Sequence, residues 1–540
     1  MYESGLKAIA VVGSLHETIL GIAFLALVLW ALASIFRSGE QPLGQRLSTA
    51  LVPLALLAIC SRCVSVVLQA PHWDWNACRL APALAYFRGY DLYFGAGSGP
   101  IVSTVYGPIA GLLLAPCALF PEPTGAILMA SVITLTVFTG PLLWAHVRAG
   151  RVAPASRIDT LGAFALAFLG AASLRSTSYM LGSVHVDAPA VALGLLSCLP
   201  LIPRARAIRD SDLMLAATLA ALAVSTKQIA IPVPLAHLTF LGLAYGSRKA
   251  WRYSALLVGV GLVLLLIYSL LFDIEKMWFN MFVLLSKHPL KGGGAALPLL
   301  AGSFMKLMTQ SAAWVLLGAV AGWAIWRSRS PREADPRVWL RAQLWLLVGL
   351  VGVALLPTST LGNIKAGGGQ NSYHSVYYFI CAASLALLQL RGRRSNSNAR
   401  EERRRKLATR ALTTLLVLFG ALAFRRQLQT NHSQWLPANP QREAFDFAKG
   451  HPNQAYFPWN PLSTLMADGK LYHFELAVVD RRIGGFDPSD EHVRANLPSD
   501  LRYVAFHPAR QSEGMMSYLP EFSRGVELPE LPDWIVYMRE

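Results

Sequence analysis

A polar stretch that could do chemistry, from Pro71 to Pro108, interrupts segments that are apolar enough to span a membrane. Within it, Asp74 lies between two tryptophans just after a long apolar run, and the piece 75–90 is amphipathic enough to lie on a membrane surface. A carboxylate partly withdrawn from water holds a proton more readily, which suits it to act as a general base. Aspartate also commonly caps the start of a helix, so catalysis and capping both remain open for Asp74.

Other ionisable residues stand where apolar segments begin or end, and in a membrane protein such residues are functional candidates. His185 and Asp187 precede an apolar run within the segment VHVDAP, where they either contact substrate or only cap a helix. Lys227 and Gln228 end another run. A lysine there either extends to the membrane surface or binds the phosphate of a lipid-linked substrate.

The segment 365–378, KAGGGQNSYHSVYY, combines a cation, three glycines and hydrogen-bonding side chains at the entry to an apolar run. Its candidate ligands are Lys365, Gly367, Asn371, Tyr373 and His374. Glycine amides beside a helix start can form an anion site, so the segment indicates a place for a phosphate group. The alternative is a flexible loop followed by a belt of interfacial tyrosines.

A membrane framework must bring these residues together, because the chain of 540 residues is 54% hydrophobic and only 15% charged, with a mean hydropathy of +0.42. Repeated runs of 18 or more apolar residues are typical of a polytopic membrane protein. The candidate spans are 17–36, 47–70, 101–120, 124–146, 160–178, 187–203, 213–227, 229–246, 253–272, 311–327, 339–357, 372–390 and 408–424.

The formal net charge of +17 comes largely from lysines and arginines in short loops between the apolar segments, as the rule of positive cytoplasmic loops predicts. Membrane topology therefore explains the charge, and we expect no nucleic-acid partner. The five basic loops, which we place in the cytoplasm, are 146–157, 204–209, 248–252, 327–341 and 391–410. The six cysteines show neither a metal-ligand spacing nor a disulfide framework.

The predicted fold is an all-α polytopic membrane protein of about 11–13 transmembrane helices, followed by a small C-terminal α/β domain. Residues 1–424 would form the transmembrane domain with an outer loop at 71–105. Residues 425–540 lack a run of spanning length and would form an extracytoplasmic domain. Counting spans places 71–100 outside only if one segment within 101–146 fails to cross, so we expect a partial or re-entrant segment there.

Together these features resemble the GT-C superfamily of membrane glycosyltransferases, in particular its bacterial mannosyl- and arabinosyl-transferase-like members. The resemblance is carried by Asp74, the G-x-D-L-Y phrase around Asp91, the Tyr106-Gly107-Pro108 opening, the H-x-D phrase at 185–187, Lys227–Gln228, and the K-x-G…N-Y phrase from Lys365 to Tyr373. These motifs are short, although the architecture covers nearly the whole chain. Two features depart from the family: the acidic pair common in the first loop is Asp74 alone, and the second proline of Y-P-P is missing.

The resemblance implies a polyprenyl-phosphate-linked sugar as donor and a glycan, lipid or protein acceptor, with hexosyl and pentosyl transfer both open. Asp74 would take the proton of the acceptor hydroxyl in an inverting displacement. Lys227, Gln228, Lys365, Gly367, Asn371, Tyr373 and His374 would bind the donor phosphate, and Asp91, Tyr106, His185 and Asp187 would contact substrate. No cofactor is implied, and the lone Asp74 leaves a divalent metal without support.

Two alternatives remain: a secondary transporter or flippase, and a glycan polymerase or ligase that shares the donor chemistry. A transporter typically has repeated halves and polar residues near the bilayer midplane, whereas the charges here lie at segment ends. We therefore expect a multi-pass enzyme of the plasma (inner) membrane, embedded in the lipid bilayer, that makes a cell-envelope glycan. Its active site and C-terminal domain would lie on the extracytoplasmic face.

This topology predicts that residues 71–100, 273–298, 362–373 and 425–540 share the outer face and that 391–410 is cytoplasmic. Single cysteines placed in each region and labelled with an impermeant reagent in intact cells would check it. Labelling at position 74 that requires permeabilised cells would contradict an outward site.

Overall fold

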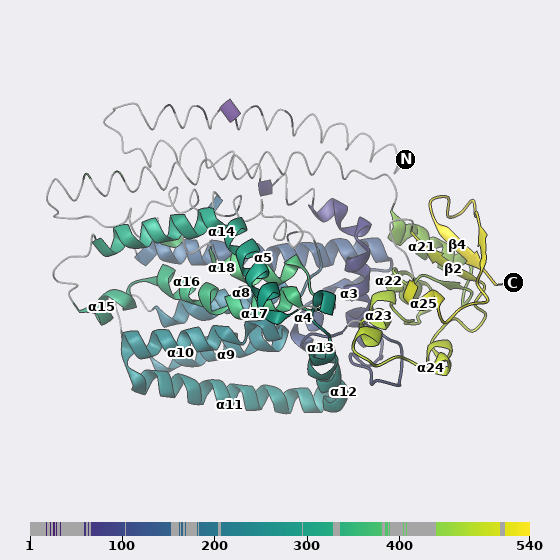
Figure 1. Ribbon diagram of the computed structural model, residues 1–540, viewed down its shortest axis with the longest axis horizontal. Helices are drawn as coiled ribbons and strands as arrows, with labels where there is room; N and C mark the ends of the chain where they lie inside the picture. The colour runs from purple at the N-terminus through teal and green to yellow at the C-terminus, as the bar shows by residue number, and fades with distance from the viewer. Residues whose placement is uncertain are drawn as a thin grey trace.

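The computed structural model describes residues 66–102, 104–152, 183–202, 207–293, 295–327, 335–380, 439–507 and 513–539, together with isolated positions elsewhere. Long helices form one body, and a small sheet with short helices lies at one end of it, near the C-terminus (Figure 1). The predicted spans 17–36, 160–178 and 408–424, most of 47–70 and 381–390, and the predicted domain boundary at 424 fall outside the described residues. The division into two domains therefore stays a prediction.

The helices of the larger body are α3 (Asp74–Tyr86), α4 (Pro108–Leu112), α5 (Pro123–Val152), α8 (Asp187–Cys198), α9 (Asp210–Thr226), α10 (Pro232–Tyr245), α11 (Ser247–Leu271), α12 (Ile274–Trp278), α13 (Leu284–Lys287), α14 (Ala296–Arg327), α15 (Pro336–Arg341), α16 (Leu344–Ala354), α17 (Leu356–Ile364) and α18 (His374–Ile380). Most of them follow the predicted apolar runs, whereas α3 lies in the polar stretch and α12, α13 and α15 include segments predicted as loops. Among the residues that the structure describes, four stretches are long and apolar enough to cross a membrane: 123–150, 228–245, 247–271 and 344–364.

A short helical piece lies where a partial segment was expected within 101–146. Pro108–Leu119 is an apolar helical piece of only 12 residues, made of α4 and a 3-10 turn, whereas a span needs about 20. That this segment does not cross the membrane stays a prediction. Proline explains its shortness, because Pro108 begins α4 and Pro116 lies inside the following turn, where a ring nitrogen cannot donate a backbone hydrogen bond.

Three local expectations differ from the structure. Residues 248–252, which we predicted as a basic loop, form the first turn of α11 instead. Helix α10 is joined to α11 by Gly246 alone, whose positive φ of +90° favours glycine. Helix α14 begins at Ala296, well before the predicted 311. Helix α3 is mostly buried instead of lying flat on a membrane surface, because the C-terminal part of the chain packs against it.

The C-terminal part is α/β, as predicted. Four strands form one sheet in the order β1-β2-β4-β3, with β1 parallel to β2 and the other pairs antiparallel. The strands are β1 (Ala455–Tyr456), β2 (Tyr503–Phe506), β3 (Arg524–Val526) and β4 (Ile535–Met538), and the helices are α21 (Pro440–Gly450), α22 (Pro461–Asp468), α23 (Glu475–Ile483), α24 (Asp490–Ala495) and α25 (Glu513–Met516). In register, Val504 lies opposite Tyr537 and Ala505 opposite Val536.

The C-terminal part is joined to the polar loop after α3 by backbone and side-chain contacts. The Trp75 ring packs edge-on against Trp459 and Phe474 with centroids 5.9 and 6.2 Å apart. The buried Arg481 guanidinium donates to the carbonyls of Gly95, at 2.9 Å, and Ala96. The aromatic rings are packed together and the buried guanidinium has hydrogen-bond acceptors, as buried polar groups require. The loop and the C-terminal part therefore pack as one unit.

Gly107 is the point of closest approach between α4 and α9. A Cβ atom on Gly107 would lie 1.5 Å from the Ser225 carbonyl oxygen, and the Gly107 amide donates to the Thr226 carbonyl at 3.2 Å. Glycine is required here by space rather than by backbone conformation, since its φ is −70°.

We expect Gly107→Ala to lower the free energy of unfolding by about 1–3 kcal/mol or more, because backbone must move to admit the methyl group. Gly111→Ala in the same helix is the matched control, since its Cβ would meet neighbours at ordinary distances of 3.7 and 3.8 Å. Thermal unfolding of both variants in detergent checks the difference. Equal melting temperatures would contradict the packing described here.

Candidate functional site

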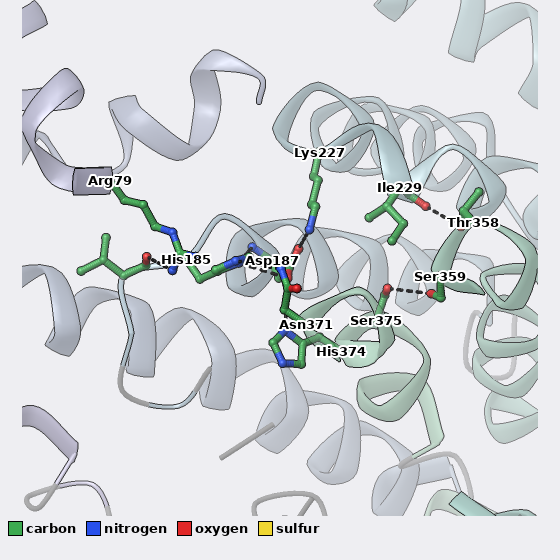
Figure 2. A network of polar contacts seen from close by, with 11 residues as sticks. Arg79, His185, Asp187, Lys227, Ile229, Thr358, Ser359, Asn371, His374 and Ser375 are labelled. Atoms are coloured by element: carbon green, nitrogen blue, oxygen red, sulfur yellow. Dashed lines mark hydrogen bonds and ion pairs between the residues drawn. The ribbon is translucent and has the colours of Figure 1, made fainter. Parts of the chain in front are cut away.

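The ends of three helices meet around one buried carboxylate, that of Asp187 at the start of α8 (Figure 2). Lys227, which closes α9, pairs with its Oδ1, and His374, which opens α18, lies 3.1 Å from its Oδ2 through Nδ1. Asp187, Lys227 and His374 are 3, 8 and 2% exposed. A buried charge needs such partners, so these contacts fix the three helix ends relative to one another.

His185 is held by contacts at both ring nitrogens. Its Nδ1 is 3.0 Å from Asp187 Oδ2 and 3.2 Å from the Asp187 backbone nitrogen, and its Nε2 is 3.3 Å from the amide nitrogen of Asn371. Because both a donor and an acceptor face Nδ1, these contacts fix the position of the ring and not its tautomer. Burial, with Arg79 nearby, lowers the pKa of His185 to about 3. The imidazole is therefore neutral.

Arg79 adds a permanent positive charge beside this network. It projects from α3, and its Nη1 donates to the Val184 carbonyl at 3.1 Å while its guanidinium lies 5.3 Å from the centre of the Trp75 ring. No ion pair joins it to a carboxylate within the part of the chain that the structure describes. Since Lys227 and Asp187 compensate each other and His185 is neutral, Arg79 leaves the network with excess positive charge.

These side chains adjoin a cavity of about 520 Å³. It is lined by Trp75, Cys78, Arg79, Pro82, Ala83, Leu92, Thr104, Val105, Tyr106, Gly107, Ala110, Gly111, Leu113, Leu114, Thr134, Val184, His185, Val186, Pro189, Gly367, Gly369, Asn371, His374, Phe474, Leu476 and Asp480. Most of the wall is apolar, with a few polar groups at one part, as is typical of sites for ligands that are largely apolar. The walls come from α3, α4, α5, α8 and α23 and from the loop before α18.

The structure brings together six of the residues that the sequence singled out. His185, Asp187, Lys227, Asn371 and His374 form the polar network, and the Tyr106 ring covers Lys227 at 5.2 Å. Gly367, in the left-handed conformation with φ +74°, lines the cavity nearby.

The other predicted site residues lie outside the cavity lining. Asp74 begins α3 and is 5% exposed. Asp91 is largely exposed and pairs with Lys276 at 2.8 Å. Lys365 Nζ donates to the Leu285 carbonyl at 3.0 Å.

Gln228 and Tyr373 fill structural positions as well. Gln228 donates to the carbonyls of Val105, at 3.2 Å, and Met281, at 3.0 Å, and so joins the loop before α4 to the helical stretch after α12. The Tyr373 hydroxyl is 2.6 Å from the Ser303 hydroxyl, inside the helix core. The roles predicted for these residues in donor binding remain predictions.

Sequence reasoning missed Arg79 and Asp480, both of which line the cavity. Arg79 had a signal, because it stands four residues after Trp75 on the same helix and therefore shares its face. Asp480 had none, since it is one charged residue among several in a helix of the C-terminal part. Within the described ranges, no group of three or more His, Cys, Asp or Glu side chains is placed to hold a metal ion.

We expect Asp187→Asn to lower the free energy of unfolding by about 3–5 kcal/mol, because it leaves the buried Lys227 ammonium without its counter-charge. Combining it with Lys227→Met should recover part of the loss, because the unpaired charge is then gone as well. Asp210→Asn is the control, since that carboxylate pairs with Lys249 and Arg252 at an exposed position. Denaturation of purified protein followed by tryptophan fluorescence measures all three. A single variant as stable as the wild type would rule out the proposed role of the pair.

No family model matches the chain, and no curated protein sequence matches it. A crystal structure of ArnT from Cupriavidus metallidurans bound to undecaprenyl phosphate is similar, with a TM-score of 0.54 at 12% identity, over 89% of this chain and 97% of that one. The apo state of the same protein gives a TM-score of 0.53 at 12% identity, over 90% and 98%. An oligosaccharyltransferase from Archaeoglobus fulgidus scores 0.42 at 10% identity, over 90% and 74%. The likeness to ArnT concerns the fold: the chain has the same fold as that protein over most of its length, in line with the architecture predicted from the sequence.

Proposed function

We propose that the chain transfers a sugar from a polyprenyl-phosphate donor to an acceptor hydroxyl within the cavity, on the extracytoplasmic face of the membrane. The observation that carries this proposal is the Arg79 guanidinium, which lines an otherwise mainly apolar chamber without a carboxylate partner among the described residues. A guanidinium is always charged and presents donors in a fixed fork that matches phosphate oxygens. The similar ArnT structure has undecaprenyl phosphate bound, which supports the same class of donor here.

The two parts of the cavity wall suit the two parts of such a donor. Apolar residues on α3, α4 and the loop between them, such as Pro82, Leu92 and Leu113, would contact the prenyl chain. Arg79 would hold the phosphate, together with the amides of Gly367 and Gly369, which also line the cavity. Contacts of this kind stabilise the charge that grows on a departing phosphate, which is the main demand of glycosyl transfer from this donor.

The Asp187 network would act on the donor indirectly. Asp187 holds His185, Lys227 and His374 at one place, so the rings of His185 and His374 line the cavity in fixed orientations. Lys227 does not line the cavity, and it would contribute long-range positive potential under Tyr106 instead of a direct phosphate contact. Preorganised charge of this kind costs no rearrangement during the reaction.

We expect Arg79→Gln to weaken binding of undecaprenyl phosphate by roughly tenfold to a hundredfold, since a lost charge-assisted hydrogen bond costs about 1.5–3 kcal/mol. Arg88→Gln is the matched control, because Arg88 follows the same helix but donates to the Leu465 carbonyl outside the cavity. Binding of radiolabelled undecaprenyl phosphate to protein in nanodiscs measures both. Transfer itself is tested with a panel of radiolabelled polyprenyl-phosphate hexoses and pentoses. If Arg79→Gln binds as the wild type does, the phosphate site is elsewhere.

A further inference from the structure

The cavity has one acidic wall residue in the part of the chain that the structure describes, and this residue is Asp480 on α23. The carboxylates that the sequence brought forward lie elsewhere. Asp187 is committed to the helix-end network, and Asp91 pairs with Lys276 at the surface. Asp74 is buried at the start of α3 without lining the cavity. A base for the acceptor must reach the cavity, and Asp480 meets that requirement.

Two loops hold Asp480 against the cavity. The His288 ring lies between the carbonyl oxygens of Ala366, 3.2 Å from Nδ1, and Asp480, 3.1 Å from Nε2. The backbone of Gly367 passes so close that a Cβ there would lie 3.3 Å from Asp480 Oδ1. These contacts hold the Asp480 backbone at the junction of the C-terminal part with the glycine turn, and its carboxylate lies beside Gly367.

The charges around Asp480 leave its carboxylate able to take up a proton. Its neighbour Arg481 donates to the carbonyls of Gly95 and Ala96, so that guanidinium is occupied elsewhere. Burial raises the pKa of Asp480 to about 6, and the nearby His288 opposes the increase. The other titratable groups of the described cavity wall are Cys78, Arg79, Tyr106, His185 and His374. A base whose pKa is close to the working pH is efficient in proton transfer.

We propose that Asp480, supplied by the C-terminal part of the chain, is the general base of the transfer and that the acceptor nucleophile is a neutral hydroxyl. This proposal rests on the proposed function. The acceptor oxygen attacks the anomeric carbon and forms the new C–O bond as the bond from that carbon to the phosphate oxygen breaks. The polyprenyl phosphate leaves with the bonding electron pair, and the hydroxyl proton passes to Asp480. An ionised carboxylate at this position repels a phosphate acceptor, which is why a hydroxyl is favoured.

The experiment uses full-length protein in liposomes, with dodecyl glycosides as hydroxyl acceptors and dodecyl glycoside phosphates as the competing class. Three variants are compared with the wild type: Asp480→Asn, Asp74→Asn and Asp487→Asn. Asp487 is the matched control, because it lies near Asp480 but pairs with Arg482 at an exposed position. Undecaprenyl phosphate binding is measured first, and a wild-type protein that does not bind it would contradict the proposed function independently of Asp480.

We expect Asp480→Asn to bind undecaprenyl phosphate and unfold as the wild type does, while transferring sugar about 10²–10⁴-fold more slowly. The wild-type rate should rise tenfold per pH unit below about pH 6 and level off above it, because only the ionised carboxylate accepts a proton. That acidic limb should be absent from the residual rate of Asp480→Asn and retained in Asp487→Asn.

Three results would overturn the assignment. One is a near-normal rate in Asp480→Asn. Another is an Asp74→Asn variant that loses the acidic limb while Asp480→Asn keeps it, which would make Asp74 the base. The third is transfer confined to the glycoside phosphates.

Discussion

The buried carboxylate of Asp187 is the constraint on which the site depends. Hydrogen bonds and an ion pair tie it to Lys227, His185 and His374, so the ends of α8, α9 and α18 cannot move independently. Breaking one member of a buried ion pair leaves a charge that the surroundings cannot solvate. The same contacts that hold the helices together therefore also orient the polar wall of the cavity.

The second part of the site comes from the end of the chain. Phe474, Leu476 and Asp480 complete a cavity whose other walls are membrane helices and the polar loop after α3. Arg481 fixes this arrangement by donating to the loop carbonyls of Gly95 and Ala96. The cavity thus combines a mainly apolar wall with a few polar groups from α3, from helix ends and from the C-terminal part.

The sequence allowed the membrane class, the α/β tail and the helix-end residues of the polar network to be predicted. Asp187, Lys227 and His374 could be identified from the sequence because an ionisable residue at the end of an apolar run is energetically costly in a membrane protein and therefore indicates a function. The contacts between them could not be predicted, because they join residues 40 and 187 positions apart in the chain and no local sequence pattern encodes such pairing.

The remaining part of the site was hidden for a related reason. Arg79 lies one helical turn after Asp74 and Trp75. Its role in the site becomes visible only in the structure, where it contacts the Val184 carbonyl and lines the cavity. The packing of the C-terminal part against α3 was not predicted, because hydrophobic periodicity cannot tell a membrane surface from the surface of another part of the same chain.

The position of Asp480 and Phe474 has a consequence for biosynthesis. The membrane helices leave the ribosome first, and the residues that close the cavity are among the last to be made. A nascent chain can insert its helices and form the Asp187 network while the chamber still lacks one wall. The complete cavity forms only when the tail folds onto the loop after α3, so a prematurely terminated chain is a membrane protein whose cavity lacks this wall.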